Sequence, residues 1–282
     1  MPEEREFQLP GLTLAAREWG NRNGRPVIFL HGWLDNAGSF DRLVPLLENC
    51  HSLAVDSAGH GLSTNRSADS TYNIWQEVGD IVHIADQMGW EQFILAGHSR
   101  GANVATLIAG TFPERVNKLV LIEGGVATIG NTEDAPENLA QSFRDRVKLA
   151  QRSGRIFADR DEAIAGRRDG WSMLSEEAAE ILAARSLRQV KEGFQWQFDQ
   201  RLKGKSEFLL THDQLRAFVS RVSVPVLLFL AQDSPIQSMP FFEDIISGFT
   251  HLEKVVVPGG HHLHLEGAQT LIAERIEAFF AP

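Results

Sequence analysis

A short apolar run that ends in Gly-x-Ser-x-Gly constrains the fold of this chain more than any other feature. Residues 93–96 are apolar, the pentapeptide Gly97-His98-Ser99-Arg100-Gly101 follows, and a helical pattern of small residues begins at once. This pattern is typical of a nucleophile elbow, a tight turn from strand to helix that holds a serine above the edge of a sheet. The glycines make room for neighbouring backbone in the strained turn. Alone, the motif also fits a plain glycine-rich turn, so its context decides whether Ser99 is a nucleophile.

Composition and charge limit the possible classes of protein. The 282 residues, 43% of them hydrophobic, suffice for one large α/β domain with an insertion or for two small domains, and they argue against disorder. With 27 Lys and Arg against 37 Asp and Glu, the net charge is −10, whereas a nucleic-acid-binding protein needs a basic face. Cys50 is the single cysteine, so no internal disulfide can form.

Targeting signals are also missing from the sequence pattern. The charged residues 1–6 precede no apolar signal core, and no apolar run approaches the ~20 residues of a membrane span. We therefore expect a cytoplasmic protein that acts on a small-molecule substrate, with neither a nucleic acid nor a membrane as its partner. The oligomeric state stays open.

Apolar runs alternate with helical patterns along the chain. Runs at 26–30, 52–56, 93–96, 118–123, 225–231 and 254–257 have the character of strands buried in a sheet. The alternation predicts an α/β fold with a mostly parallel central sheet flanked by helices, after an antiparallel hairpin within residues 6–19. Between 124 and 222 the composition shifts to Ala, Glu, Arg and Gln. We interpret this segment as an inserted helical cap, with residues 1–123 and 223–282 forming the core domain.

Groups with useful chemistry follow the carboxyl ends of the predicted strands: Trp33, Ser99, Glu123, Asp233 and His261. In a parallel sheet these ends share the edge at which ligands bind. The pair His31-Gly32, directly after an early buried strand, has the position of a loop that supplies one oxyanion donor. We expect the two donors to be the backbone N–H groups of Trp33 and Arg100.

A histidine cluster near the end of the chain supplies the candidate base. His261 follows the pair Gly259-Gly260, which allows a loop to carry an imidazole over the sheet edge, where it takes and returns a proton. His262 and His264 are rival candidates, and three histidines also raise the question of a metal ion. Because no further set of Cys, His and carboxylate with ligand spacing accompanies them, we favour His261 as a base, without a metal or a cofactor.

These motifs resemble a known family. Residues 31–43, His-Gly-Trp-Leu-Asp-Asn-Ala-Gly-Ser-Phe-Asp-Arg-Leu, together with the elbow pentapeptide, are similar to the serine hydrolase-like protein group within the α/β-hydrolase fold. The similarity covers about 27–124 and 224 to the end, and the cap only weakly. It implies a serine nucleophile, a histidine base and ester or related acyl substrates. Haloalkane dehalogenases and epoxide hydrolases resemble this fold but have aspartate at the position of Ser99.

The acid of the triad has two candidates. The family usually places it in a Gly-x-x-Asp pattern after the strand that follows the cap, but here the expected position falls on Ser234 and Ala231 replaces the glycine. Asp233 stands one residue early. In some family members the acid instead follows the strand after the elbow helix, and Glu123 fills that position. Either carboxylate would serve if it reaches the distal ring nitrogen of the histidine, and we favour Glu123.

The leading function is hydrolysis of a small carboxylic ester or thioester through an acyl-enzyme on Ser99. We expect His31, His98, Trp171 and Trp196 to line an aromatic substrate pocket between sheet and cap. Two alternatives stay open. Cofactor-free dioxygenases of heteroaromatic substrates resemble this fold and place their acid after the same strand as Glu123. The second alternative is a non-catalytic binding protein of the hydrolase fold.

Overall fold

The computed structural model describes residues 2–170 and 173–281 and contains an eight-stranded sheet in the order β1-β2-β4-β3-β5-β6-β9-β10. Strand β2 pairs antiparallel with β1 and β4, and the remaining pairs are parallel. The sheet strands are β1 (Glu3–Leu9), β2 (Leu12–Gly20), β3 (Arg25–Leu30), β4 (Cys50–Val55), β5 (Phe93–His98), β6 (Val116–Ile122), β9 (Val226–Ala231) and β10 (Leu252–Val257). The predicted opening hairpin and mostly parallel sheet are confirmed.

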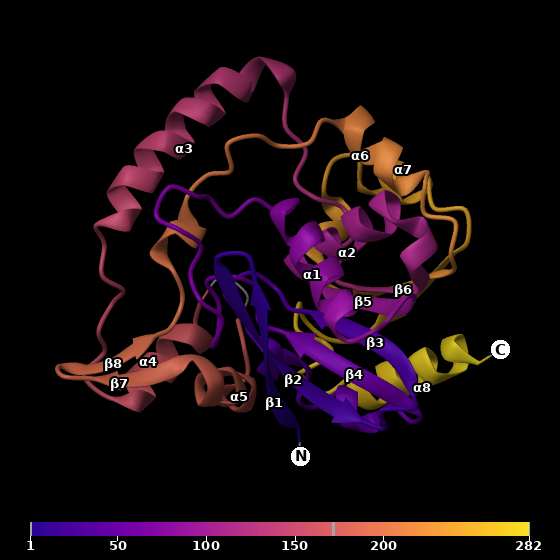
Figure 1. Ribbon diagram of the computed structural model, residues 1–282, viewed down its shortest axis with the longest axis horizontal. Coiled ribbons are helices and arrows are strands. Elements are labelled where there is room, and N and C mark those ends of the chain that lie inside the picture. The colour runs from indigo at the N-terminus through magenta and orange to yellow at the C-terminus, as the bar shows by residue number, and fades with distance from the viewer. Residues whose placement is uncertain (1, 171–172, 282) are drawn as a thin grey trace.

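Helices cover both faces of the sheet (Figure 1). The helices are α1 (Gln76–Gln87), α2 (Arg100–Thr111), α3 (Ala135–Ala150), α4 (Arg160–Arg168), α5 (Glu176–Ser186), α6 (His212–Val219), α7 (Phe242–Ile246) and α8 (Gln269–Phe280), with 3₁₀ turns η1 (Ala37–Phe40), η2 (Val44–Leu46), η3 (Pro113–Arg115), η4 (Thr132–Asp134), η5 (Gln200–Lys203) and η6 (Pro235–Ser238). Alternate residues of β3 face opposite sides: Ile28 joins the core under α1, α2, α6 and α7, whereas Phe29 joins the core under η1, η2 and α8.

The part of the chain from α3 through η5, between β6 and β9, forms a layer beside the sheet. In Figure 1, α3 stands away from the sheet as an arm that leads to α4, α5 and the hairpin of β7 (Leu187–Val190) and β8 (Gly193–Trp196). The sequence analysis expected helices alone here. The hairpin instead forms with the β-prone residues Val190, Phe194 and Trp196 in its strands and with Gly193 at φ 142°. Helix α6, although it lies within 124–222, packs in the core against α2. The division into core and cap stays a prediction.

Helix α5 ties this layer to the sheet. The Nε of Arg185 donates to both oxygens of the buried Asp56, which follows β4. The side-chain amide of Asn36 donates to Leu182 O at 3.0 Å and Ser186 Oγ at 2.6 Å, both on α5. A buried charge pair of this kind is costly to break, because the remaining partner is left without compensation.

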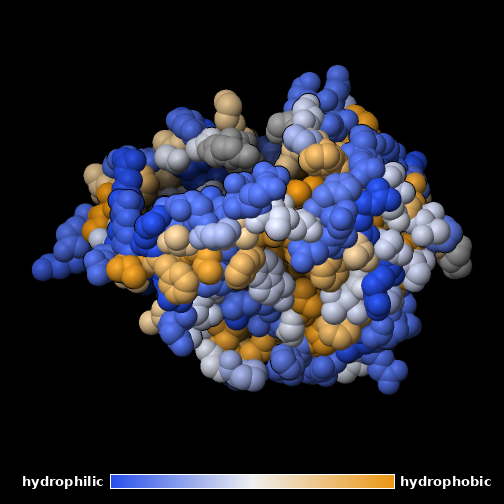
Figure 2. Space-filling view, turned by 90° about the horizontal axis from the view of Figure 1, so that it is seen from above, coloured by the Kyte–Doolittle hydropathy of each residue, from blue (hydrophilic) through white to orange (hydrophobic). Residues whose placement is uncertain are grey.

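Hydrophilic side chains dominate the face seen from above the arm, with hydrophobic residues in scattered patches among them (Figure 2). This distribution is ordinary for a globular protein surface.

Close packing of backbone around the elbow fixes the position of Ser99. Its φ of 52° and ψ of −117° lie in a sparsely populated region, at the junction of β5 and α2. A Cβ at Gly97 would lie 2.5 Å from Gly101 O, and one at Gly101 would lie 2.1 Å from Leu30 O. The strand, the helix and the neighbouring strand β3 therefore meet at distances that only glycine permits.

We predict that Gly97→Ala lowers the free energy of unfolding by about 2 kcal/mol or more, because the added methyl group overpacks rigid backbone. Gly79→Ala is the matched control: Gly79 is exposed within α1 and a Cβ there meets nothing within 4 Å. That variant should gain up to about 1 kcal/mol from helix propensity. Urea unfolding measures both, and equal stabilities for the two variants would contradict this account of the elbow.

Candidate active site

A cavity of about 230 Å³ opens beside the elbow. Its wall combines the serine and histidine singled out in the sequence with aromatic and basic side chains from the segment beside the sheet. The lining residues include Ser99, His98, His261, His262, Trp33, Asp35, Phe157, Arg167, Trp196 and Phe198. Residues separated by more than 160 positions in the chain, such as Ser99 and His261, thus border one mostly apolar space.

A carboxylate holds the imidazole of His261 at this wall. Glu123 Oε2 lies 3.3 Å from His261 Nδ1, and Glu123 is fully buried while the His261 side chain keeps 11% of its surface exposed. A carboxylate at Nδ1 fixes the tautomer in which the other ring nitrogen, Nε2, is free to accept a proton.

Glu123 is itself held by two further hydrogen bonds. Its Oε1 accepts from Ala231 N at 2.6 Å, and its Oε2 accepts from Ser234 Oγ at 2.8 Å. The residue adopts φ 49° where β6 ends, which turns its side chain toward β9. Asp233, the rival acid, is exposed, and within residues 2–170 and 173–281 it makes no hydrogen bond or ion pair. The geometry brings Glu123, and not Asp233, to His261.

The two expected oxyanion donors lie on either side of the elbow. Arg100 is the first residue of α2, so its N–H has no partner within the helix. Trp33 follows β3 by three positions and lines the cavity. In the described part of the chain neither backbone N–H donates a hydrogen bond, which leaves both available to a ligand. The Arg100 side chain is engaged elsewhere, with Nη2 2.5 Å from Oε1 of Glu77 on α1.

The residues expected to form the substrate pocket are only partly brought together. His98 and Trp196 line the cavity, whereas Trp171 lies outside the described residues. The expectation for His31 is corrected, because this residue is buried beneath the site and does not line the cavity. Its Nδ1 donates to Gly32 O at 2.7 Å and its Nε2 accepts from Ser57 N at 3.0 Å, so both ring nitrogens serve the loop structure.

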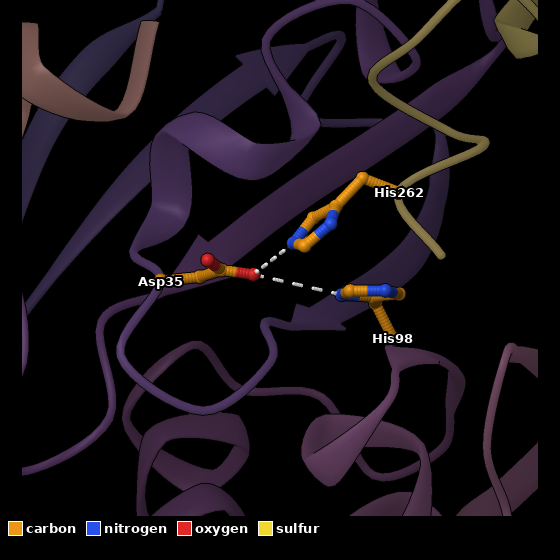
Figure 3. A group of neighbouring side chains, drawn as sticks. All are labelled: Asp35, His98 and His262. Carbon is orange, nitrogen blue, oxygen red and sulfur yellow. Dashed lines mark hydrogen bonds and ion pairs between the residues drawn. The ribbon is translucent and has the colours of Figure 1, made fainter. Parts of the chain in front are cut away.

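A buried network around Asp35 supports the cavity wall (Figure 3). His262 Nε2 donates to Asp35 Oδ2 at 3.0 Å, and the Arg167 guanidinium of α4 binds the other oxygen. His98 Nδ1 lies 3.7 Å from Asp35 Oδ2, and His98 Nε2 donates to His261 O at 2.9 Å. The network therefore joins the loop after β3, the elbow, the loop that carries His261 and helix α4.

Three groups of this network, Asp35, His98 and His262, would offer a metal ion ligand atoms within 4.8 Å of one another. The positive Arg167 guanidinium on the other oxygen of the same carboxylate opposes a divalent cation there. A hydrogen-bonded network accounts for the contacts present.

Burial controls the charge of these groups. Burial raises the pKa of Asp35, but the neighbouring His262 and Arg167 outweigh it and hold that pKa well below its usual range. Burial, and then the adjacent His264 and His262, hold the pKa of His98 well below the ordinary value of a histidine. His98 is therefore neutral near pH 7, which agrees with its role as a single N–H donor to the His261 carbonyl.

Sequence reasoning missed the roles of Asp35 and Arg167. Asp35 stands in the motif after β3, yet only the fold shows that it faces two histidines and an arginine. Arg167 lies in a segment whose pattern indicated helix alone, so no local signal marked it.

Comparisons with known proteins agree with this architecture. Residues 25–268 match the family described as alpha/beta hydrolase fold, and the chain belongs to that family. It is similar to the serine hydrolase-like protein of Danio rerio, at 31% identity over 98% of this chain and 88% of the relative. Serine hydrolase-like protein 2 of Homo sapiens is also 31% identical, over 98% of this chain and 93% of the relative. The predicted resemblance is confirmed.

Solved structures show the same fold. The crystal structure of a hypothetical protein from Pseudomonas aeruginosa PAO1 matches with a TM-score of 0.95 at 39% identity, covering 99% of this chain and all of the other. The thioesterase domain from the curacin biosynthetic pathway has a TM-score of 0.87 at 23% identity, covering 99% of each chain. The family and the names of the relatives support a hydrolase with a small-molecule substrate. Within the described residues, each helix is too short or too polar to cross a membrane.

We predict that stability falls as the pH decreases from about 7.5 to about 5.5. Burial is the first cause that lowers the pKa of His60, His98 and His264 well below the ordinary value. The unfolded chain therefore binds more protons than the folded chain below about pH 6.5, and each histidine removes on the order of 1 kcal/mol per pH unit there.

Urea unfolding at several pH values measures this slope. His264→Asn, which keeps a polar group near Ser39, should reduce the slope by about one proton. A free energy of unfolding that is constant over this range would contradict the assignment of neutral buried histidines.

Proposed function

We propose that this protein is a serine hydrolase that cleaves a small carboxylic ester or thioester through an acyl-enzyme on Ser99. The observation that carries the proposal is the contact of His261 Nδ1 with the buried Glu123, at a cavity that Ser99 also lines. We infer that Glu123, rather than Asp233, is the acid of the triad. A cytoplasmic location stays a prediction.

The residues take the following roles in the reaction. The Ser99 hydroxyl attacks the acyl carbon, and His261 Nε2 takes its proton and then delivers it to the leaving alcohol or thiol. Glu123 stabilises the imidazolium that forms, without itself becoming protonated. The N–H groups of Trp33 and Arg100 receive the developing oxyanion, each contributing about 3 kcal/mol of transition-state stabilisation. A water molecule activated by His261 then releases the acid from Ser99.

The cavity supports a compact acyl or aromatic group as the part of the substrate nearest Ser99. Trp33, Phe157, Trp196 and Phe198 supply apolar surface to its wall, and the volume of about 230 Å³ suits a small group rather than a long chain. The Nε1 of Trp33 donates to Leu202 O at 3.0 Å, which fixes the indole against the segment beside the sheet.

The two carboxylates give a direct test. Glu123→Gln should reduce kcat for p-nitrophenyl acetate or butyrate about 10³-fold or more, because the amide no longer stabilises the imidazolium. Asp233→Asn is the matched control, changing an exposed carboxylate in the same way, and should stay within about twofold of wild type. Ser99→Ala should abolish the acyl-enzyme and labelling by a fluorophosphonate.

The opposite ranking of the two acid variants would reassign the acid. Oxygen uptake with a heteroaromatic substrate and no ester turnover would favour a cofactor-free dioxygenase over a hydrolase. If Ser99 reacted with neither ester nor fluorophosphonate, a non-catalytic binding protein would be favoured.

A further inference from the structure

A second, larger cavity of about 650 Å³ adjoins the catalytic one. It lies between the end of α3, the loop at residues 59–68 and the segment that runs from β7 through η5. Trp196 and Phe198 line both cavities, so these two residues lie at the boundary between the two spaces. In contrast to the apolar inner cavity, this outer cavity is lined mainly by polar and charged residues.

The charges of the outer cavity are unbalanced. Its wall includes four arginines, Arg66, Arg152, Arg188 and Arg201, and a single carboxylate, Asp199. Arg66 pairs with Asp80, and Arg201 pairs with Asp199 at 2.7 Å. These two arginines are therefore neutralised by partners within the protein.

The other two arginines have no such partner. Among residues 2–170 and 173–281, no carboxylate lies within ion-pair distance of Arg152 or Arg188, and Arg188 makes a long contact of 3.4 Å to the Gln195 amide oxygen. Both guanidinium groups are exposed to solvent at the cavity. The chain as a whole has a net charge of −10, so two unpaired arginines make this cavity wall a local region of positive charge.

A third cation, Lys203, lies near Arg152. The Lys203 ammonium is 4.7 Å from the centre of the ring of Phe198, a residue that lines both cavities. Partial burial, and then the charge of Arg152, lower the pKa of Lys203. Arg152 and Lys203 are thus near enough to repel each other, and an anion between them would relieve that repulsion.

We propose that the outer cavity binds a phosphate group on the leaving-group side of the substrate, held by Arg152 and Arg188. This inference rests on the proposed function, because it extends the substrate from the inner cavity past Trp196 and Phe198. Guanidinium groups match phosphate oxygens with paired N–H donors, so an arginine pair favours phosphate over a single carboxylate. The substrate class is accordingly an acyl ester or thioester whose alcohol or thiol carries a phosphate.

Anion binding is measured first, because it does not depend on catalysis. Calorimetry at low ionic strength should detect one pyrophosphate per chain in wild type and in Ser99→Ala. The double variant Arg152→Ala/Arg188→Ala should weaken this binding about tenfold or more. Arg144→Ala is the matched control, since Arg144 is an exposed arginine of α3 paired with Glu137 and lies outside the cavity; it should bind as wild type does.

Kinetics then test whether the anion belongs to the substrate. The butyryl thioesters of pantetheine and of its phosphate ester differ by one phosphate, and wild type should prefer the phosphorylated one about tenfold in kcat/KM through a lower KM. The double variant should lose this preference while its kcat with the neutral thioester is unchanged.

The possible failures are distinguishable. Pyrophosphate binding that is absent in wild type, or equal in wild type and the double variant, overturns the anion site even if the esters are hydrolysed. Pyrophosphate binding that weakens in the double variant, together with equal wild-type kcat/KM for the two thioesters, overturns the assignment of the bound anion to the substrate. A lack of all thioester and ester turnover overturns the proposed function, and with it the assignment of the anion to a substrate, but not the pyrophosphate result.

Discussion

The close approach of three backbone segments at the elbow is the constraint on which the rest of the site depends. A Cβ at Gly101 would overlap the carbonyl oxygen of Leu30 at the end of β3, and one at Gly124 would lie 2.5 Å from Ser99 O. The ends of β3, β5 and β6 are therefore locked to the first turn of α2. One packing requirement thus sets the positions of the candidate nucleophile, of both expected oxyanion donors and of the strand end that carries Glu123.

The local features of this arrangement could be predicted from the sequence, but the acid could not be settled in the same way. The strand, the elbow and the following helix are encoded within about a dozen neighbouring residues, where periodicity and glycine spacing are informative. The contacts of Glu123 with Ala231 and Ser234 span more than 100 positions. Ser234 occupies the position at which the family pattern places an aspartate, and its hydroxyl donates to Glu123 instead. Only the register of β6 beside β9 reveals that exchange.

The wrong expectation for His31 and the missed role of Arg167 also arise from contacts that the local sequence pattern does not encode. His31 directly follows the buried strand β3, and His98 is the last residue of the buried strand β5, yet only the His31 ring is taken up by hydrogen bonds with Gly32 and Ser57. Arg167 lies 132 positions from Asp35, and its helix gives no sign of that contact. Periodicity shows which residues share a face of an element, but not which distant element covers that face.

The histidines around the cavity divide into supporting and reactive groups through their partners. His98 donates to the backbone of His261, and burial lowers its pKa, so it positions the loop that carries His261. His262 is bound to Asp35, whose charge Arg167 also balances. His261 combines a buried carboxylate at Nδ1 with an exposed part at the cavity. Helix α4 supplies Arg167 to the same network, so a displacement of α4 from the sheet would disturb the loop that carries His261. The network therefore couples the segment beside the sheet to the candidate base.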